Sequence, residues 1–387
     1  MATAEPSPCL MLVAGEASGD LHGATLSGAL RNHAPGWRLV GMGGSRMAHA
    51  GVELLANPAD RAVVGASEAV SRLPHLYRAF RVLCRALKAE RPRVLVLIDF
   101  PEFNLRLARA ARRLEIPVVY FIPPQVWAWR PGRARLLARL ASRILAVFPF
   151  EPPIYEAAGG RVEFVGHPLV DLLPNGLSRE GARHDLGVPR DATLVGLLPG
   201  SRREEVERLL PPMAEAARRI RERVPDARFL ASPASTVDPR LVERLLRGAP
   251  LELVRGRTYE VMAAADLLLV ASGTATLEAA LIGTPMVVCY RVSRLSGLIG
   301  RLLIRVPWVS LANIVSGRGV VPELLQGDAT AARLAEEAVS LLKDRDRLRA
   351  QRLAFDELRG ALGTPGVAER AARRILEVAG YRAAVVS

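Results

Sequence analysis

A short polar turn between two apolar segments carries the most informative chemical pattern in the chain. The apolar run 267–270 predicts a buried parallel strand, and a helical segment, 277–281, begins a few residues later. The turn between them contains Ser272, Gly273, Thr274, Ala275 and Thr276. Such a turn directs free backbone N–H groups and the positive end of a helix at one point, where small side chains let a phosphate approach. An ordinary helix N-cap is the alternative, since Ser and Thr cap helices without any ligand.

Two other features of the same half suit a nucleotide. Glu278, about one turn into the helix, could accept hydrogen bonds from two ribose hydroxyls, as an acidic residue does in dinucleotide sites. Gly200, Ser201 and Arg202 follow another apolar run, and an arginine there can neutralise a departing diphosphate, which a metal would otherwise do. A solvated arginine at a helix start is the alternative for Arg202. We see no cluster of metal ligands, so we expect no metal and no cofactor.

The first half offers a carboxylate that could act as a general base. Asp99 follows the apolar run 94–98. Burying a carboxylate there costs free energy unless the group is paired or takes part in catalysis. Partial desolvation can tune such a group for proton transfer. Capping of the helix that follows is the alternative. Glu16 and Asp20, in the loop after the first predicted strand, are rival bases, and His22 ranks last because a lone histidine is more often structural.

A loop after another predicted strand brings aromatic and basic side chains together. Trp127, Trp129 and Arg130 lie there, a combination suited to the wall of an acceptor site or to an anionic headgroup. The segment 41–44, Gly-Met-Gly-Gly, lacks the full glycine fingerprint of dinucleotide sites, and a tight turn explains it equally well. His167 is expected to orient the turn between two domains rather than to react.

Apolar strand-like runs alternate with amphipathic helical runs throughout the chain, whose 387 residues exceed the size of a single core. Short apolar runs separated by helices predict parallel sheets with right-handed crossovers. The runs fall into two series that divide near 171–176, which predicts an α/β protein of two doubly wound domains facing each other across a cleft. The predicted strands are 9–14, 37–41, 94–99, 117–121, 144–148, 162–165, 193–198, 227–231, 251–254, 267–271 and 285–289.

The formal net charge of +14 is unevenly distributed. Residues 106–143 contain nine arginines and one acidic residue, and residues 75–93 contain five arginines, one lysine and one acidic residue. Such a field favours an anionic partner, which can be nucleic acid, acidic phospholipid or a phosphorylated substrate. Two apolar segments with basic residues, 73–88 and 295–308, fit either core helices with a solvated face or helices in a membrane interface.

The sequence contains no signal for a membrane span or for secretion. No apolar run reaches the roughly 18 residues that a span needs. The first apolar segment, 9–14, has no basic region before it, unlike a signal peptide. Three scattered cysteines, Cys9, Cys84 and Cys289, have no metal or redox spacing and predict a reducing cytoplasm.

Together these motifs resemble the lipid-A-disaccharide synthases, inverting glycosyltransferases of the GT-B fold, and the resemblance covers nearly the whole chain. The matching motifs are 14–20, 99–104, 126–130, 149–152 and 165–169 in the first half, and 198–202, 272–278, 310–314 and 321–326 in the second. Ala312 departs from the family, which usually has proline there. This puts the stiffness of that loop in doubt and not the activity.

The resemblance implies a reaction and a set of site residues. UDP-2,3-diacylglucosamine donates its sugar to the 6-hydroxyl of 2,3-diacylglucosamine 1-phosphate, which gives a β-1,6-linked disaccharide 1-phosphate and UDP. Asp99 matches the general base and Arg202 the diphosphate ligand. The nucleotide region comprises Gly200, Ser201, residues 272–276, Glu278, Asn313 and Gln326. The acceptor and membrane side comprises Asn104, Trp127, Trp129 and Arg130.

The resemblance also implies how the chain is organised and where it works. An acceptor-side domain, 1–173, is followed by a UDP-sugar domain, 174–350, and the last segment, 351–387, packs back on the first domain. Because both substrates are acylated anions, we expect the acidic cytoplasmic face of the inner membrane as a partner, and the resemblance allows a homodimer.

Two classes of function compete with this interpretation. A UDP-N-acetylglucosamine epimerase or the lipid II glycosyltransferase of peptidoglycan synthesis would use the same fold, and detection of a disaccharide product separates transfer from epimerisation. A nucleic-acid binder would explain the charge but not the glycine turns or Asp99, and the chain lacks aromatic residues spaced for stacking bases. We therefore expect no nucleic-acid partner, which a gel shift with random nucleic acid would test.

Overall fold

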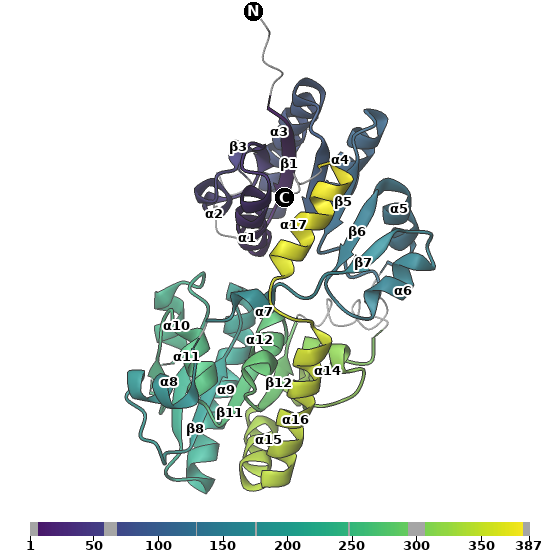
Figure 1. Cartoon of the computed structure of the whole chain (residues 1–387). Helices are drawn as coiled ribbons and strands as arrows, with labels where there is room; N and C mark the ends of the chain where they lie inside the picture. Colours follow the sequence, from purple (N-terminus) through teal and green to yellow (C-terminus); the bar gives the residue numbers. More distant parts are fainter. Residues whose placement is uncertain are drawn as a thin grey trace, which may run out of the picture. The chain divides into compact units, whose positions relative to one another are not determined.

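The computed structural model describes residues 7–57, 68–128, 130–174, 176–246, 248–292 and 306–381, with the main chain only for residues 68–73. Two compact units are present, one of residues 1–171 with 362–387 and one of residues 172–361. Each unit contains one parallel β-sheet with helices packed against it (Figure 1). The predicted α/β class is confirmed.

The sheet of the first unit has seven parallel strands in the order β3-β2-β1-β4-β5-β6-β7. The strands are β1 (Cys9–Ala14), β2 (Arg38–Met42), β3 (Glu53–Ala56), β4 (Val94–Ile98), β5 (Val118–Phe121), β6 (Arg143–Ala146) and β7 (Val162–Phe164). The helices are α1 (Ala17–His33), α2 (Ser45–His49), α3 (Glu68–Glu90), α4 (Pro101–Arg113), α5 (Gly132–Leu140), α6 (Glu151–Glu156) and α17 (Val367–Val378), and α7 (Leu169–Leu172) lies at the junction of the units.

The sheet of the second unit has six parallel strands in the order β10-β9-β8-β11-β12-β13. The strands are β8 (Leu194–Leu198), β9 (Arg228–Ala231), β10 (Glu252–Leu253), β11 (Leu267–Ala271), β12 (Met286–Tyr290) and β13 (Glu323–Leu325). The helices are α8 (Arg179–Asp185), α9 (Arg203–Arg223), α10 (Pro239–Leu245), α11 (Thr258–Ala264), α12 (Thr274–Ile282), α14 (Leu311–Ser316), α15 (Ala331–Lys343) and α16 (Arg345–Ala361), with a 3₁₀ turn at Gln326–Asp328.

All eleven predicted strands are present, with ends that shift by one or two residues. Two strands were missed, β3 and β13, and both form an edge of their sheet. Neither has the long apolar run that identifies a central strand, since β3 reads ELLA and β13 reads ELL. An edge strand has one neighbour instead of two, so its sequence needs less continuous apolar character.

The two strand orders are variants of one pattern, the doubly wound order 3-2-1-4-5-6, with one further strand in the first unit. In this topology the chain leaves its first strand in one direction and its fourth in the other, so a crevice opens between the loops that follow them. These loops follow β1 and β4 in the first unit and β8 and β11 in the second. Ligands of such sheets bind at those loops.

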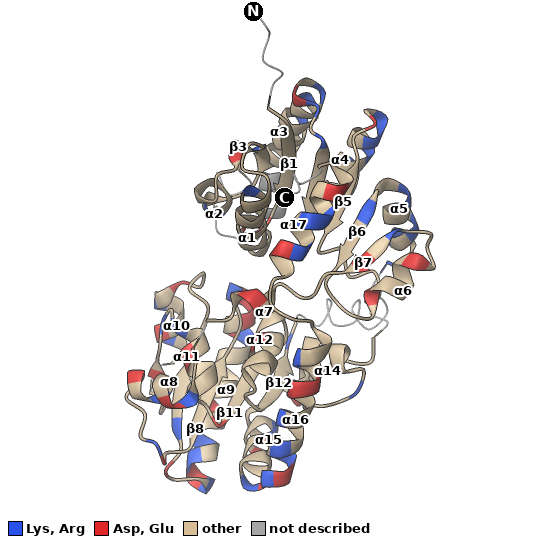
Figure 2. Ribbon diagram, in the orientation of Figure 1, with Lys and Arg blue, Asp and Glu red and all other residues tan. Residues whose placement is uncertain are grey.

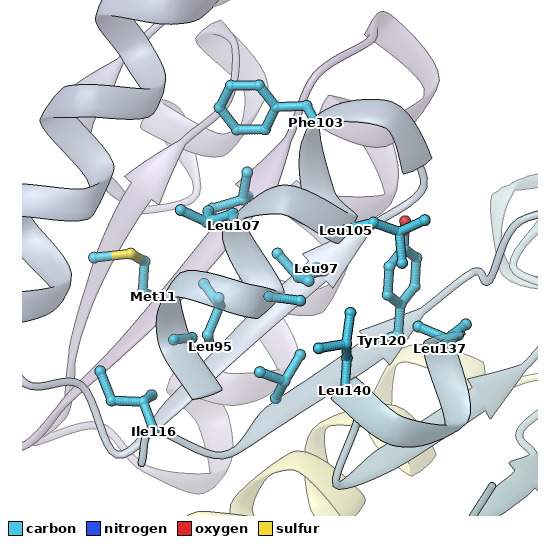
Figure 3. Close-up of a cluster of buried hydrophobic side chains, with 14 of the residues drawn as sticks. Met11, Leu95, Leu97, Phe103, Leu105, Leu107, Ile116, Tyr120, Leu137 and Leu140 are labelled. Atoms are coloured by element: carbon cyan, nitrogen blue, oxygen red, sulfur yellow. The ribbon is translucent and has the colours of Figure 1, made fainter. Parts of the chain in front are cut away.

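The central strands of the first unit are apolar on both faces, which is why their sequences show continuous apolar runs rather than alternation. Met11, Leu95, Leu97 and Tyr120 point into a core that α3, α4 and α5 cover (Figure 3). On the opposite face α1 packs against α17, although their sequences lie more than 330 residues apart (Figure 1).

The segment 351–361, which the resemblance placed with the first domain, belongs to the second unit. It forms the C-terminal part of α16, which packs against α12 and α14 through the buried side chains of Ala354, Phe355 and Leu358. The Gln351 side chain adds a polar anchor, because its Oε1 accepts a hydrogen bond from the Met286 N–H at 2.9 Å. The return to the first unit therefore begins at residue 362 and not at 351.

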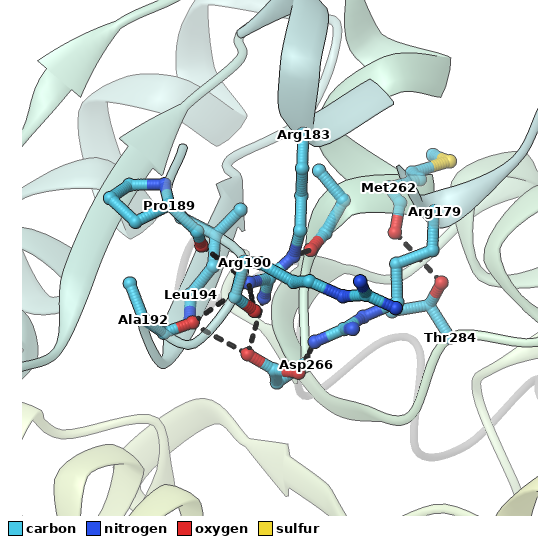
Figure 4. A network of polar contacts seen from close by, with 10 residues as sticks. Arg179, Arg183, Pro189, Arg190, Ala192, Leu194, Met262, Asp266 and Thr284 are labelled. Carbon is cyan, nitrogen blue, oxygen red and sulfur yellow. Dashed lines mark hydrogen bonds and ion pairs between the residues drawn. The ribbon is translucent and has the colours of Figure 1, made fainter. Parts of the chain in front are cut away.

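A buried arginine lies at the N-terminal ends of the central strands of the second sheet (Figure 4). The guanidinium of Arg183, on α8, donates to the carbonyl oxygens of Ala264, Pro189, Arg190 and Ala192 at 2.8–2.9 Å. It also forms an ion pair of 2.8 Å with Asp266, whose carboxylate accepts the Leu194 N–H. This network ties α8 to the starts of β8 and β11.

Candidate active site

The loop after β4 has an unusual backbone conformation. Asp99 and Phe100 both have φ of 47°, in the left-handed region that residues other than glycine rarely adopt. Each such residue costs on the order of 1–3 kcal/mol, a strain that is found most often at functional sites. Gly15 allows the turn to form, because a Cβ atom there would lie 2.1 Å from the Phe100 ring. The loop after β1 and the loop after β4 are thus packed together.

The Asp99 carboxylate is half-buried and is subject to the charge of Glu16 in the loop after β1. The parallel register pairs Ala14 with Ile98, so the two loops leave neighbouring strands at the same level. Burial raises the pKa of Asp99, the Glu16 charge raises it further, and a hydrogen bond from the Phe100 N–H partly offsets both effects. A partly desolvated carboxylate with a raised pKa is suited to accept a proton near neutral pH.

Two other predicted residues of the first unit have structural partners. Asp20, 9% exposed, accepts hydrogen bonds from the N–H groups of Gly44, Met47 and Arg46 at 2.7, 3.0 and 3.2 Å, and so caps the start of α2. Asn104 was expected on the acceptor side, but its side chain is completely buried and donates to main-chain oxygens under the Asp99 turn. Asn104 has no exposed surface with which to contact an acceptor, and the expectation for it is corrected.

Of the two histidines that the sequence analysis set aside, His167 is buried and His22 is half-buried. His22 has a pKa lowered by burial to about 4, and His167 has one lowered by burial, and secondarily by His22, to about 3. Both rings are therefore neutral at physiological pH. His167 Nδ1 accepts the Leu169 N–H at 3.2 Å, which fits the expected role in the turn at the end of the unit.

Trp127 belongs to an aromatic cluster at the ends of β5 and β6. Its ring packs edge-on against Phe148 and Phe150, and its Nε1–H donates to Glu151 at 3.2 Å. Glu151 is fully buried and also accepts the N–H groups of Val147 and Phe148. Burial raises the pKa of Glu151 to about 7, against the lowering effect of these three hydrogen bonds.

The next residue of the predicted acceptor wall, Arg130, pairs with an acidic residue of α4. Arg130 is exposed, has φ of 54°, and lies 3.5 Å from Glu102, which also pairs with Arg133. Trp129 lies outside the described residues. The sequence analysis gave Glu151 no role of its own, although its position just after an apolar strand in the segment Pro-Phe-Glu-Pro was a usable signal.

In the second unit the turn after β11 has the expected geometry. Gly273 is the N-cap of α12 with φ of 149°, no side chain caps the helix, and open space surrounds the position of a Cβ. The hydroxyls of Ser272 and Thr276 donate to the carbonyls of Val309 and Gly273 at 2.9 and 2.8 Å. The exposed Thr274 N–H therefore stands at a helix start that no side chain neutralises.

Arg202 lies after β8, the strand next to β11. Its side chain is 78% exposed and forms an ion pair of 3.3 Å with Glu205. The same carboxylate accepts the N–H groups of Ser201 and Arg202, and Gly200 has φ of 113° close to it. These amides are occupied, so the accessible groups of this loop are the exposed side chains of Ser201 and Arg202.

Three further residues of the expected nucleotide region differ in how they are held. Glu278 accepts one hydrogen bond, from the Tyr259 hydroxyl at 3.0 Å, and burial raises its pKa. The Gln326 side-chain oxygen accepts the Val292 N–H at 3.3 Å. Asn313 is 1% exposed, and its amide donates to Val321 and Glu323 and accepts from Val320 and Val321.

The expectation for Asn313 as a nucleotide ligand is therefore corrected. Its amide already makes the four hydrogen bonds that such a group can make. Its function is to shape the loop from α14 to β13. Tyr290, at the end of β12, is half-buried, and burial and the Glu205 charge raise its pKa while Arg202 and Arg208 lower it.

Within the described residues no group of three His, Cys, Asp or Glu side chains could hold a metal ion. The three cysteines are free, and Cys9 and Cys289 are buried.

Comparison with known proteins decides between the enzymes that share this architecture. The family model of the lipid-A-disaccharide synthetases matches residues 10–374. The chain belongs to this family. The lipid-A-disaccharide synthase of Syntrophus aciditrophicus is 47% identical over 369 residues, which cover 95% of this chain and 96% of the relative. That of Anaeromyxobacter sp. strain K is 46% identical over 372 residues, with coverage of 95% and 97%.

Solved structures agree at the level of the fold. The glycosyltransferase of kitacinnamycin superposes with a TM-score of 0.66 at 18% identity, covering 96% of this chain and 100% of the other. The UDP-GlcNAc 2-epimerase from Neisseria meningitidis gives 0.59 at 11% identity, with coverage of 95% and 98%. The GT-B fold is thereby confirmed. Lipid-A-disaccharide synthetases condense UDP-diacylglucosamine with diacylglucosamine 1-phosphate to form the lipid A disaccharide, and this hexosyltransferase activity is that of the chain.

Proposed function

We propose that the chain transfers 2,3-diacylglucosamine with inversion at the anomeric carbon, and that Asp99 is the general base. The half-buried Asp99 carboxylate, held in a strained turn and subject to the charge of Glu16, is the observation that carries this proposal. A displacement with inversion needs a base that removes the proton of the attacking hydroxyl. The acceptor 6-hydroxyl gives its proton to Asp99, its oxygen bonds to C1 of the donor sugar, and the bond from C1 to the UDP oxygen breaks.

The donor is proposed to bind at the loops after β8 and β11. The uncapped start of α12 suits the diphosphate, because the N–H groups and the helix dipole both favour an anion there. Arg202 supplies the positive charge that stabilises UDP as it leaves. Glu278 keeps one carboxylate oxygen for the ribose hydroxyls while the Tyr259 hydroxyl holds the other. Asp20, Asn104 and Asn313 are left out of the proposed ligand contacts.

The configuration of the new linkage tests the proposed inversion. The donor sugar is α-linked to UDP, so inversion gives a β-linked disaccharide. We expect the anomeric proton of the product to show the large coupling constant of a β-glucosaminide in a proton NMR spectrum. An α-linked product would contradict inversion, and with it the role of Asp99 as a base that acts on the acceptor.

The variant Arg202→Ala tests the donor side. Loss of one charge-assisted hydrogen bond should raise KM for the UDP-sugar by about tenfold or more and lower turnover. Arg203→Ala is the matched control, since Arg203 is also exposed and paired within α9, to Glu207. We expect the control to keep the parent values, and magnesium or a chelator to change neither protein. Activity lost in chelator and restored by magnesium would contradict the metal-free donor site.

We further propose that the enzyme works on the cytoplasmic face of the inner membrane and that α3 contacts the lipid. This helix buries Leu83 and Leu87 in the core, while Tyr77 is 63% and Val82 38% exposed. Arg78, Arg81 and Arg85 are exposed on the same helix, and Figure 2 shows further basic residues on α4 and α5. No helix in the described ranges has the length and apolar character to cross a bilayer. The second candidate segment, 295–308, lies outside the described residues except for 306–308.

Binding to liposomes tests the role of α3. Apolar insertion alone gives marginal binding, and each basic residue near an acidic surface adds about 1 kcal/mol, so the two contributions must combine. We expect the protein to sediment with vesicles that contain phosphatidylglycerol. Added salt should weaken this binding, and so should replacement of Arg78, Arg81 and Arg85 by Glu. In the matched control, Glu replaces Arg345, Arg349 and Arg352, three exposed residues of α16. Equal sedimentation with neutral vesicles would contradict the electrostatic contribution, and sedimentation with neither would contradict the proposal.

A further inference from the structure

We infer that Tyr120 and Asn104 are positioning residues that hold the Asp99 turn in its left-handed conformation and thereby aim the catalytic carboxylate. The inference rests on the proposed role of Asp99. It adds two residues, from β5 and α4, that touch no substrate and act only through the main chain of Asp99.

Both side chains donate to the same carbonyl oxygen. The Tyr120 hydroxyl lies 2.6 Å from the Asp99 oxygen, and Asn104 Nδ2 lies 2.7 Å from it. Asn104 Nδ2 also donates to the Ile98 oxygen at 3.2 Å. The turn is thus connected by side chains to the neighbouring strand on one side and to the following helix on the other.

The sheet itself does not provide these bonds. The main-chain ladder between β4 and β5 ends at the Asp99 N–H, which donates to the Phe121 oxygen at 3.3 Å. No main-chain N–H among the described residues donates to the Asp99 oxygen. A main-chain carbonyl that leaves the sheet ladder needs another donor, and here the two side chains supply it and so stabilise the left-handed turn.

Both donors are buried, so their polar groups are committed to the Asp99 turn. Tyr120 and Asn104 have no exposed surface. Burial of a polar group costs free energy unless the group forms a hydrogen bond. Asn104 Oδ1 is buried with no hydrogen-bond partner among the described residues. A flipped amide would place its oxygen against two carbonyl oxygens, so the observed orientation is fixed by the turn. The structure tolerates an unpaired oxygen in order to place the NH₂ group at Asp99.

The first test is the variant Tyr120→Phe, which removes one donor and keeps the ring in the core. We expect turnover to fall about tenfold, since small displacements of a reacting group have effects of this order or larger, and KM for both substrates to stay within twofold. The acid limb of the pH profile of kcat/KM should move to lower pH, because a carboxylate released toward solvent loses part of its raised pKa. Asn104→Ala should act in the same direction.

A matched control separates positioning from loss of a buried hydrogen bond. The Thr284 hydroxyl is buried and donates to the Met262 oxygen at 2.7 Å, just before the start of β12 and away from the carboxyl ends of the strands. Thr284→Val should lower thermal stability to a similar extent as Tyr120→Phe, with turnover and pH profile unchanged. If Thr284→Val reduces turnover as much as Tyr120→Phe does, the positioning inference is overturned.

A double variant distinguishes the inference from the proposed function. Tyr120→Phe should have no further effect on turnover in an Asp99→Asn background, because Tyr120 acts through Asp99. If the two effects multiply, Tyr120 acts by another route and the inference fails while Asp99 keeps its role. If Asp99→Asn alone leaves turnover unchanged, the base assignment fails, whatever the result for Tyr120.

Discussion

Turnover of the Asp99→Asn variant is expected to fall about 100-fold or more, with UDP binding unchanged, because an amide cannot accept the proton of the attacking hydroxyl. Asparagine has the same size and keeps the hydrogen bond from the Phe100 N–H. Single-turnover assays with both substrates would measure the chemical step, and calorimetric titration with UDP would measure donor-side binding. A loss confined to the chemical step identifies the base.

The pH dependence of the parent enzyme gives a second measurement of the same residue. Asp99 must be ionised to act, so kcat/KM should fall as the pH drops through its raised pKa, above the range of an ordinary aspartate. A group whose pKa is raised on folding contributes stability below its unfolded pKa that is lost as the pH rises through the folded one. The Asn variant lacks this loss, so at neutral pH it should be no less stable than the parent.

Glu16 and Asp20 are the controls for this assignment. Glu16→Gln removes the charge that raises the pKa of Asp99, so it should shift the acid limb to lower pH without abolishing turnover. Asp20→Asn should weaken the cap of α2 and lower stability, with turnover within a few fold of the parent. Parent-like turnover in Asp99→Asn, together with a large loss in Glu16→Gln, would move the base to Glu16.

The sequence predicted the position of Asp99 and Glu16 because apolar runs mark parallel strands, and the carboxyl ends of neighbouring strands must meet. It could not predict that Asp20 caps α2 or that Asn104 lies under the turn. Their partners are main-chain atoms, which every residue has, so no residue pattern identifies them. A short polar side chain after a strand looks the same whether it faces a ligand or the backbone.

In the second unit, too, the sequence predicted a backbone turn but not the roles of all its side chains. The turn 272–276 was predicted from glycine and small polar residues, and its backbone has the expected form. Asn313 was assigned to the nucleotide by resemblance, yet its amide is saturated by neighbours. Arg183 was missed altogether, because α8 reads REGARHD, a composition typical of an exposed helix. Only the fold reveals that four carbonyls converge on this guanidinium.

Arg183→Met is expected to have the largest effect on stability, a loss of about 3–5 kcal/mol, the usual range when one partner of a buried, hydrogen-bonded charge is removed. Methionine replaces the apolar stem of the side chain, so the loss isolates the hydrogen bonds rather than a cavity. Four carbonyl oxygens would lose their donor and Asp266 would lose its buried partner. Urea unfolding followed by circular dichroism and by Trp308, the single tryptophan within 172–361, would report on this unit.

Arg179→Met is the matched control, because Arg179 pairs with the same carboxylate but its side chain is much more exposed to solvent than that of Arg183. Its ion pair with Asp266 measures 2.5 Å, but the side chain is 47% exposed against 3% for Arg183. An exposed ion pair contributes at most about 1 kcal/mol, since water solvates both charges when they separate. If the two variants lost equal stability, the ion pair with Asp266 would be the stabilising contact. A loss confined to Arg183→Met would show that the buried contacts of Arg183, the carbonyl bonds together with its ion pair, hold α8 to β8 and β11.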